Sequence, residues 1–196
     1  MKNNFTPLSK QFYNQPTLDL AKNLLGQILV HETDEGTSSG IIVETEAYLG
    51  KADQAAHSFK NRRTKRTEIM FASPGHVYIY EMHTHTLVNV VGAEEGTPNA
   101  ILIRAVEPLT GIELMQKRRP VDKRTNLTSG PGKLTKALGI TKEHYGRTFF
   151  EPPLFIAEGG KPAEIEIGTR IGIDNSGEAK DYPYRFWVKD NPYVSR

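Results

Sequence analysis

Hydrophobic residues recur along this chain in two patterns, and each pattern predicts a different kind of element. Apolar side chains three and four positions apart, such as Leu20, Ala21 and Leu24, lie on one face of a helix. Thr17 before this run is the expected helix cap, and Gly26 after it is typical of a helix end. The predicted helices are Leu18–Leu25, a segment opened by the capping-box pair Thr110 and Glu113 and ending near Arg118, and Lys133–Leu138.

Short runs rich in β-branched and other apolar residues predict the strands. Pro108 is expected to end the strand before it, because proline cannot donate to a β-ladder. Between the strands, Thr33–Ser39 is predicted as a polar turn and Lys51–Glu68 as a surface loop with one short helical piece near Ala55. The predicted strands are Ile28–His31, Gly40–Tyr48, Val77–Tyr80, Leu87–Val91, Ala100–Val106, Leu154–Ala157, Arg170–Ile173 and Arg185–Val188.

The mixture of several short strands with a few helices determines the predicted fold class. No repeat or low-complexity linker divides the 196 residues, a length that suits one compact domain. We therefore predict an α+β fold, a single mixed domain over residues 1–196 with a mostly antiparallel sheet flanked by short helices.

Composition excludes several classes of protein. Apolar residues make up 37% of the chain and charged residues 24%, as in ordinary globular proteins. The absence of cysteine excludes disulfides, thiol catalysis and thiolate metal sites, and fits the reducing cytoplasm. No segment approaches the roughly 20 apolar residues that span a bilayer, so no membrane partner is expected.

Basic residues gather in two places, although the net charge is only +2. One cluster, Lys60–Arg66, contains Arg62 and Arg63, and the other runs from Lys117 to Arg124. A single run of this kind is usually a solvated surface segment. Two runs beside other candidate segments favour a polyanionic partner, because lysine and arginine neutralise phosphates.

The segment Val43–Tyr48 is the most informative for chemistry. Alternate side chains of a strand share a face, so Glu44, Glu46 and Tyr48 are expected to point the same way. Two carboxylates near a core are costly unless they are solvated, paired or used, and positioned carboxylates serve in acid–base catalysis. The spacing alone favours the structural alternative, a solvated strand end paired with arginine.

Arg104 and the tyrosines of another strand each carry two interpretations. Arg104 lies in an apolar run and needs partners, so it either pairs with Glu44 or Glu46 or orients a catalytic carboxylate or a phosphate. Tyr78 and Tyr80 share a strand face that serves either core packing or stacking on a nucleobase.

The histidines and one glycine-rich turn also allow either a structural or a functional interpretation. His57 is either structural or an aromatic face beside Tyr48. His83 and His85 have the spacing of two metal ligands on a strand, but no third ligand follows at a convincing distance, and no metal site is predicted. The turn Ser129–Leu134 lacks P-loop spacing, and is either a plain helix start or a phosphate contact through backbone amides.

A series of motifs keeps its order from about Leu18 to Ser195, nearly the whole chain. Each motif is modest by itself, and the ordered set is specific. The segments are Ile42–Gly50, Ala55–Ser58, Pro74-Gly75, Tyr78–Tyr80, Leu102–Leu109, Ser129–Leu134, Arg170–Ile173, Arg185-Phe186 and Pro192–Ser195. Together they resemble the alkyladenine (3-methyladenine) DNA glycosylases.

The resemblance implies a monofunctional hydrolase of base excision repair. Such an enzyme flips an alkylated or deaminated purine, for example 3-methyladenine, hypoxanthine or ethenoadenine, out of duplex DNA and cuts its N-glycosidic bond, leaving an abasic site. The implied fold has a curved sheet and a β-hairpin that inserts into DNA. The implied partner is double-stranded DNA with a damaged purine, and a monomer without cofactor, metal or obligate protein partner is expected.

The resemblance also assigns roles to residues. Glu46 is implied as the general base that aligns a water against the anomeric carbon, and Arg104 as the group that helps hold this water and a phosphate. The implied base-contacting residues are Tyr48, His57, Tyr80 and Asn89, of which the first three sandwich the base and the last disfavours guanine. The DNA contacts predicted from the residues themselves are Arg62 and Arg63 of the basic run, Ser129, Gly130 and Lys133 of the glycine-rich turn, and Met82 or His83 on the hairpin.

One departure from the family pattern affects the DNA-inserting hairpin. Between Tyr80 and Asn89 the chain is about one residue shorter than the pattern, and the tyrosine expected on the hairpin is missing. Met82 or His83 is the predicted replacement as the wedge.

Two other functions fit parts of the sequence. A non-catalytic nucleic-acid-binding module would use the basic runs and aromatic residues but not Glu46, and a metal hydrolase would use His83 and His85. A duplex with one lesion, incubated with chelator present and then heated in alkali, separates the three. Alkali-dependent cleavage indicates the glycosylase, binding without cleavage the module, and activity abolished by chelator the metal hydrolase.

Overall fold

The computed structural model describes residues 5–195, which form an eight-stranded antiparallel sheet with flanking helices. This confirms the predicted α+β class. The predicted domain 1–196 includes residues 1–4 and 196, which lie outside the described range. The strands are β1 (Ile28–Thr33), β2 (Gly36–Leu49), β3 (Val77–Met82), β4 (His85–Val91), β5 (Asn99–Thr110), β6 (Leu154–Ala157), β7 (Ile165–Gly168) and β8 (Arg185–Val188).

Helices within the described residues are short. The α-helices are α1 (Thr17–Asn23), α2 (Ile112–Arg118) and α3 (Pro131–Leu138). The 3₁₀ helices are η1 (Lys10–Tyr13), η2 (Phe59–Asn61), η3 (Glu68–Phe71), η4 (Arg124–Asn126), η5 (Lys142–His144) and η6 (Gly177–Asp181).

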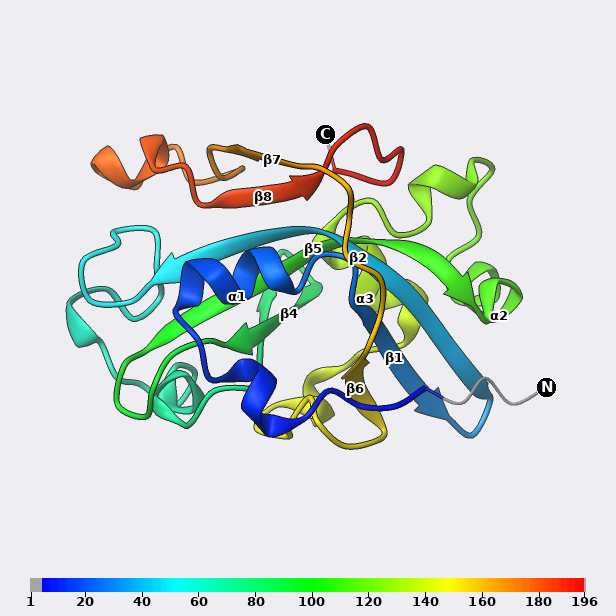
Figure 1. Cartoon of the computed structure of the whole chain (residues 1–196), viewed down its shortest axis with the longest axis horizontal. Helices are drawn as coiled ribbons and strands as arrows, with labels where there is room; N and C mark the ends of the chain where they lie inside the picture. Colours follow the sequence, from blue (N-terminus) through cyan, green and yellow to red (C-terminus); the bar gives the residue numbers. More distant parts are fainter. Residues whose placement is uncertain (1–4, 196) are drawn as a thin grey trace.

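The long strands β2 and β5 form the centre of the sheet, in the strand order β3-β4-β5-β2-β1-β6. Figure 1 shows both strands arching across the molecule. On its other edge β2 pairs first with β1 and then, from Glu44 to Glu46, with β8. Register shifts on both sides of Glu44 mark a bulge at this change of partner, and a bulge bends a strand.

The helix α1 covers one face of these central strands. In Figure 1 it lies in front of β2 and β5, whereas α3 lies behind them. The predicted apolar face of α1 is buried in the main core. Thr45 of β2 donates to the backbone carbonyl of Ala21 in α1 at 2.8 Å, so Thr45 faces α1. Its neighbours Glu44 and Glu46 consequently face the other way.

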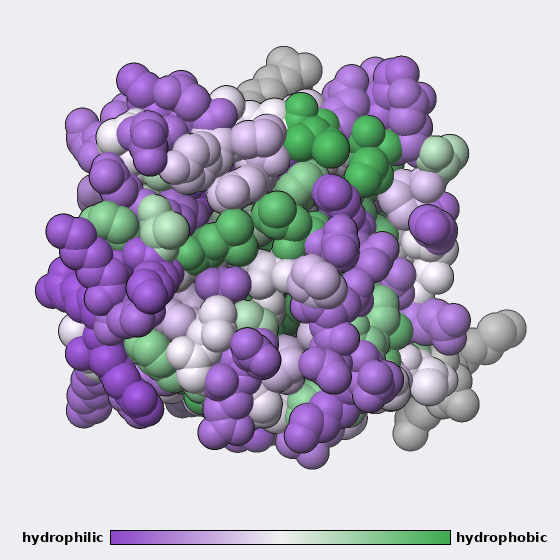
Figure 2. All heavy atoms as spheres, turned by 60° about the vertical axis from the view of Figure 1, so that its left-hand side comes forward, coloured by the Kyte–Doolittle hydropathy of each residue, from purple (hydrophilic) through white to green (hydrophobic). Residues whose placement is uncertain are grey.

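The surface is mostly hydrophilic, with hydrophobic side chains gathered in a band across one side (Figure 2). Within residues 5–195, no helix combines the length and apolar character needed to cross a membrane. The exposed large hydrophobic side chains of the described residues are Met82, Leu109, Ile167 and Ile171. Two of these, Met82 and Ile171, border a cavity.

Both predicted N-terminal helix caps, Thr17 and Thr110, are wrong. Thr17 is the first residue of α1, and its hydroxyl donates to the Gly92 carbonyl and accepts from the Asn99 side chain. Thr110 belongs to β5, and its hydroxyl bonds to that of Ser39 at 2.7 Å. Both hydroxyls are used in contacts between segments distant in sequence, which a local capping pattern does not anticipate.

Two predicted strand ends are also wrong. Pro108 lies inside β5, opposite Gly40, at a register shift where proline is tolerated in a ladder. The predicted turn Thr33–Ser39 is largely strand, because β1 and β2 pair as far as Thr33 and Gly36.

Two further segments differ from their predictions. The expected helical piece near Ala55 is found instead at Phe59–Asn61. Arg170–Ile173 is not a strand: Arg170 turns inward to pair with Asp53, and the Ile171 amide donates to a side chain rather than to a neighbouring strand. The strand β7 was not predicted.

A buried histidine pair joins β1 to the end of α3. His31 Nδ1 lies 2.7 Å from the Leu138 carbonyl oxygen, and His31 Nε2 lies 2.9 Å from His144 Nε2. Burial lowers the pKa of His31 to about 4, and the charges of His144 and Arg118 also disfavour its protonation.

This pair predicts an acid-sensitive stability. Unfolded His31 takes up a proton near pH 6.5 whereas the folded side chain resists protonation down to about pH 4, so the free energy of unfolding falls as pH drops through this window. Urea unfolding at pH 7.5, 6 and 5 measures the slope, and His31→Gln is expected to flatten it. An identical slope in wild type and variant would contradict the assignment.

Candidate active site

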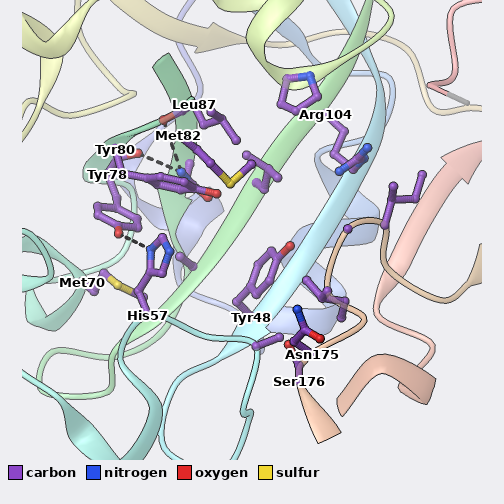
Figure 3. A pocket seen from close by; sticks show the side chains of 18 residues that line it. Tyr48, His57, Met70, Tyr78, Tyr80, Met82, Leu87, Arg104, Asn175 and Ser176 are labelled. Carbon is purple, nitrogen blue, oxygen red and sulfur yellow. Dashed lines mark hydrogen bonds between the residues drawn. The ribbon is translucent and has the colours of Figure 1, made fainter. Parts of the chain in front are cut away.

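A cavity of about 280 Å³ opens on the sheet face that carries Glu44 and Glu46 (Figure 3). Its walls come from β2, β3, β4, β5, the loop after β2 and the segment after β7. The lining residues include Tyr48, His57, Tyr78, Tyr80, Met82, Asn89, Arg104 and Ile171.

Aromatic side chains form two opposed walls of the cavity. Figure 3 shows Tyr48 across the space from a group made of His57, Tyr78 and Tyr80. In this group the rings of His57 and Tyr80 meet edge to face, with centroids 4.5 Å apart. His57 Nδ1 lies 2.7 Å from the Tyr78 hydroxyl, which fixes the imidazole in place. The cavity between the two walls is called the slot below.

The ionisation states of these rings are set by burial. Burial, reinforced by the nearby Glu46 carboxylate, raises the pKa of Tyr80 to about 12, and the pKa of Tyr48 is also raised. Burial, together with the charges of Arg66 and Arg62, lowers the pKa of His57 to about 4. The slot is therefore lined by neutral rings at neutral pH.

Glu46 lies directly behind the cavity wall. Its side chain is fully buried, and its carboxylate accepts three hydrogen bonds. Oε2 accepts from the Tyr48 hydroxyl at 2.8 Å and from Arg104 Nη1 at 3.3 Å, and Oε1 accepts from the Ile171 amide at 2.8 Å. All three donor residues line the cavity, so the carboxylate is bonded directly to its wall.

Arg104 is held by both glutamates of β2. Its Nε donates to Glu44 Oε1 at 2.9 Å, its Nη1 to Glu46, and its Nη2 to the Ser195 hydroxyl at 3.0 Å. Burial lowers the pKa of Arg104, but Glu46 and Glu44 raise it by more, so the net pKa lies above the ordinary value. Arg104 therefore stays charged at one end of the slot.

Glu44 anchors this arginine instead of facing the cavity. Its fully buried carboxylate also accepts from Arg185 Nε at 2.7 Å and from the amide and hydroxyl of Ser195 at 2.7 and 2.9 Å. The two glutamates and two arginines balance in charge, which permits their burial. The face predicted for Glu44, Glu46 and Tyr48 is confirmed by these shared partners, and the solvated strand end is not observed.

Comparison with known sequences decides the family. A sequence model of the methylpurine-DNA glycosylases matches residues 11–192. The chain belongs to this family. It is accordingly a DNA-repair hydrolase that acts on N-glycosidic bonds, and its substrate is DNA.

Proteins similar to this glycosylase occur in several bacteria, each named "Putative 3-methyladenine DNA glycosylase". One from Oceanobacillus iheyensis is 64% identical over 193 residues, 98% of each chain. One from Bacillus subtilis is 64% identical over 190 residues, 97% of each chain. One from Listeria monocytogenes serotype 4a is 51% identical over 185 residues, 94% of this chain and 89% of that one.

The β3–β4 hairpin of this glycosylase borders the cavity. Its turn residues His83 and Thr84 both have left-handed φ values, 48° and 70°, as a two-residue turn requires. Met82 is 50% exposed at the tip and also lines the cavity, whereas His83 does not. The Asn89 amide lines the cavity and donates to the Tyr78 carbonyl at 3.2 Å.

The structure separates the predicted basic residues into free and committed charges. Arg63 makes two hydrogen bonds to Glu68, whereas Arg62 and Arg66 are exposed and close enough to His57 to lower its pKa. In the second cluster Lys117 and Arg118 pair with Glu35, and Arg119 donates to the carbonyls of Asn126 and Leu127. These contacts brace α2, whereas Lys123 and Arg124 of the same cluster are exposed, and its phosphate contact stays a prediction.

The predicted α3 contacts lie beside the cavity. Gly130 precedes the helix, Pro131 lines the cavity, and Ser129 bridges to Ala105 of β5. Lys133 is half-buried in the first turn. Among the described residues, no three histidine, aspartate or glutamate side chains gather as a metal site would require, and His83 and His85 find no third ligand there.

Sequence reasoning missed Asp53, Arg170 and Ser195 as parts of the site. Arg170 and Ser195 stood at the edges of family motifs, which was the available signal. No sequence signal marked Asp53, because its partner Arg170 lies 117 positions away.

Proposed function

We propose that this glycosylase excises alkylated purines, with 3-methyladenine as the principal lesion, and that it also accepts hypoxanthine and ethenoadenine. It acts on duplex DNA and leaves an abasic site in an uncut strand. The observation that carries the proposal is the buried Glu46 carboxylate, all of whose donors line an aromatic slot. The printed names of the bacterial relatives support the choice of 3-methyladenine.

Base flipping is the first step of the proposed reaction. A base stacked in a duplex cannot reach a cavity walled by β2, β3 and β5, so the damaged nucleotide must rotate out of the helix. The cavity of about 280 Å³ lies near the lower end of the usual range for small-molecule sites, about 300–1,000 Å³, and suits a single base. Damage that weakens pairing lowers the cost of this rotation.

The slot recognises the extruded purine by stacking. Tyr48 forms one wall, and Tyr80 with His57 forms the other. Alkylation gives 3-methyladenine a positive charge, and electron-rich tyrosine faces attract cations. His57 stays neutral because burial and neighbouring cations lower its pKa, so it does not repel a charged base.

Glu46 then activates the nucleophile. A water held at the carboxylate loses its proton to Glu46 as it attacks the anomeric carbon, and the base departs with the electrons of the N-glycosidic bond. The positive sugar formed on the way is stabilised by the buried negative charge. The alkylated base is a good leaving group because its positive charge is neutralised on departure.

The proposed reaction is hydrolytic because the cavity offers no amine. Among the described residues, no lysine lines the cavity, so a Schiff base with the sugar has no donor there. The proposed partner is damaged duplex DNA, and no obligate second protein is proposed.

Met82 is the proposed wedge. It is apolar, half-exposed at the hairpin tip and adjacent to the cavity, as a residue that fills the gap left by a flipped base must be. We expect Met82→Ala to lower single-turnover excision about tenfold while His83→Ala lowers it by less than threefold. A larger loss for His83→Ala in the same assay would transfer the wedge role to the histidine.

Arg62 and Arg66 are the proposed phosphate contacts beside the cavity. Both side chains are exposed, and neither guanidinium pairs with a carboxylate of residues 5–195. Arg62→Ala/Arg66→Ala should therefore weaken binding and reduce the slope of log affinity against log salt by about 2. Arg63→Ala is the matched control, since Glu68 already pairs with that guanidinium. Equal slopes for the double variant and wild type would remove this loop from the DNA interface.

The proposal is tested with duplexes that contain one 7-methylguanine, hypoxanthine or ethenoadenine, and with methylated DNA for release of 3-methyladenine. Excision in the presence of chelator, followed by strand cleavage only after alkali, is the expected result. Binding without excision would support a non-catalytic module, and cleavage without alkali would contradict a purely hydrolytic enzyme.

A further inference from the structure

Arg170 is a second buried arginine close to the cavity, and the proposed reaction assigns it no role. Only 5% of its surface is exposed. Its guanidinium donates to both oxygens of Asp53, at 2.5 and 2.8 Å, and to the backbone carbonyls of Ala47 and Ala179, at 2.9 and 3.0 Å. One side chain thus joins β2, the loop after β2 and the segment of η6.

The guanidinium lies behind one stacking wall. Its central carbon is 4.7 Å from the centre of the Tyr48 ring and 5.4 Å from that of Tyr184. Tyr48 lines the cavity and Arg170 does not, so Tyr48 has the cavity on one side and the arginine on another. Movement of Arg170 would release the support of this ring.

The same residue controls a donor to Glu46. The next residue, Ile171, lines the cavity and donates its amide to Glu46 Oε1 at 2.8 Å. Because the two residues are adjacent, anchoring Arg170 to Asp53 also fixes the Ile171 amide.

Asp53 extends the support to the opposite wall. Its carboxylate accepts the amides of Leu49 and Ala55, each at 3.0 Å, and so shapes the loop that leads to His57. The ion pair therefore lies between the chain segments that carry Tyr48, His57 and Ile171.

Stability alone does not account for this pair. Burying two charges costs desolvation energy that their attraction often fails to exceed, and well-packed apolar residues are commonly as stable. The Nε atom of Arg170 is in addition buried and finds no hydrogen-bond partner within residues 5–195. Unlike apolar residues, the ion pair fixes the relative positions of the segments that it joins.

We propose that Arg170 is a positioning residue for base excision, which with Asp53 holds the Tyr48 ring and the Glu46 carboxylate in a fixed relation around the extruded purine. The inference rests on the proposed function. It assigns Arg170 no contact with the substrate and places its effect on the chemical step rather than on DNA binding.

The test compares two double variants that each remove a whole ion pair. Arg170→Met/Asp53→Asn leaves no unpaired buried charge, and asparagine keeps an acceptor for one loop amide. Arg118→Met/Glu35→Gln is the control, because it removes a partly buried pair from α2, a helix with no residue on the cavity. Single-turnover excision of 7-methylguanine and hypoxanthine is measured below each melting temperature, together with affinity for undamaged duplex.

The expected result is a loss of at least tenfold in the excision rate for both lesions in the Arg170 variant, with undamaged-duplex affinity within twofold of wild type. The control should retain its rate within twofold. If the Arg170 double variant does not fold, Arg170→Lys replaces it: one ammonium cannot reach Asp53 and both carbonyls together, and a severalfold loss is expected.

Two outcomes would overturn the inference separately from the function. Wild-type excision together with an unchanged rate in the Arg170 variant would refute the positioning role alone, as would a loss confined to DNA affinity. A wild-type enzyme that excises none of the lesions would refute the proposed function, and the inference with it.

Discussion

Glu46→Gln is expected to abolish excision while leaving lesion binding intact. Glutamine keeps the shape of the side chain and one acceptor oxygen but cannot take a proton from water, so the single-turnover rate should fall by about 100- to 10,000-fold, the usual contribution of a general base. Glutamine is nearly isosteric with glutamate, but both carboxylate oxygens accept here, so the new amide nitrogen must face at least one of the three donors. Rates are measured on a hypoxanthine duplex, and affinity on the same duplex by titration.

The matched control is the other buried glutamate of the same strand face. Glu44→Gln leaves the Glu46 side chain in place and keeps one acceptor oxygen for Arg185 and the Ser195 hydroxyl while losing the bond from the Ser195 amide, so its effect should be at least tenfold smaller. Equal losses in the two variants would mean that Glu46 acts only as a structural anchor. Normal turnover by Glu46→Gln would refute its role as base.

The second large effect is expected for Arg104→Met. Removing this guanidinium takes one buried donor from Glu46 and another from Glu44, and breaking a buried ion pair costs about 3–5 kcal/mol of unfolding free energy. Arg185 remains on Glu44, which favours the lower end of this range. Excision should fall by about 100-fold or more, because a charged group that orients the reacting carboxylate is lost.

Urea unfolding and single-turnover excision on the same preparation measure both quantities. Arg104→Lys is the control, since it keeps the charge but not the fork that reaches Glu44, Glu46 and Ser195, and its effects should be intermediate. A stable and active Arg104→Met would show that neither glutamate depends on this arginine.

Sequence patterns predicted those parts of the fold that depend on local information. The strands Leu154–Ala157 and Arg185–Val188 were predicted with their observed bounds, because each is a short apolar run between turn formers. The common face of Glu44, Glu46 and Tyr48 followed from strand alternation, and it survives the bulge beside Glu44. The family resemblance is confirmed by the sequence model that matches residues 11–192.

The errors arise where distant residues decide the local structure. Pro108 remains in a strand because Gly40 faces it at a register shift. The segment Arg170–Ile173 is apolar enough for a strand, yet the pairing of Arg170 with Asp53 turns it into an irregular wall of the cavity.

The role of Glu44 could not be predicted from the sequence for the same reason. Its spacing from Glu46 allowed either a solvated strand end or a catalytic pair, and only the fold brings Arg104, Arg185 and Ser195 onto its carboxylate. The division of the basic residues into free and paired charges, such as Arg62 and Arg63, likewise depends on partners that a linear cluster does not reveal.

The central claim is that the slot between Tyr48 and the His57–Tyr80 pair receives the damaged base. A crystal structure of Glu46→Gln bound to a duplex with one ethenoadenine tests it directly. We predict the ethenoadenine stacked between Tyr48 and Tyr80, with the anomeric carbon facing residue 46. An ethenoadenine that remains stacked in the duplex, or lies outside this slot, would contradict the account.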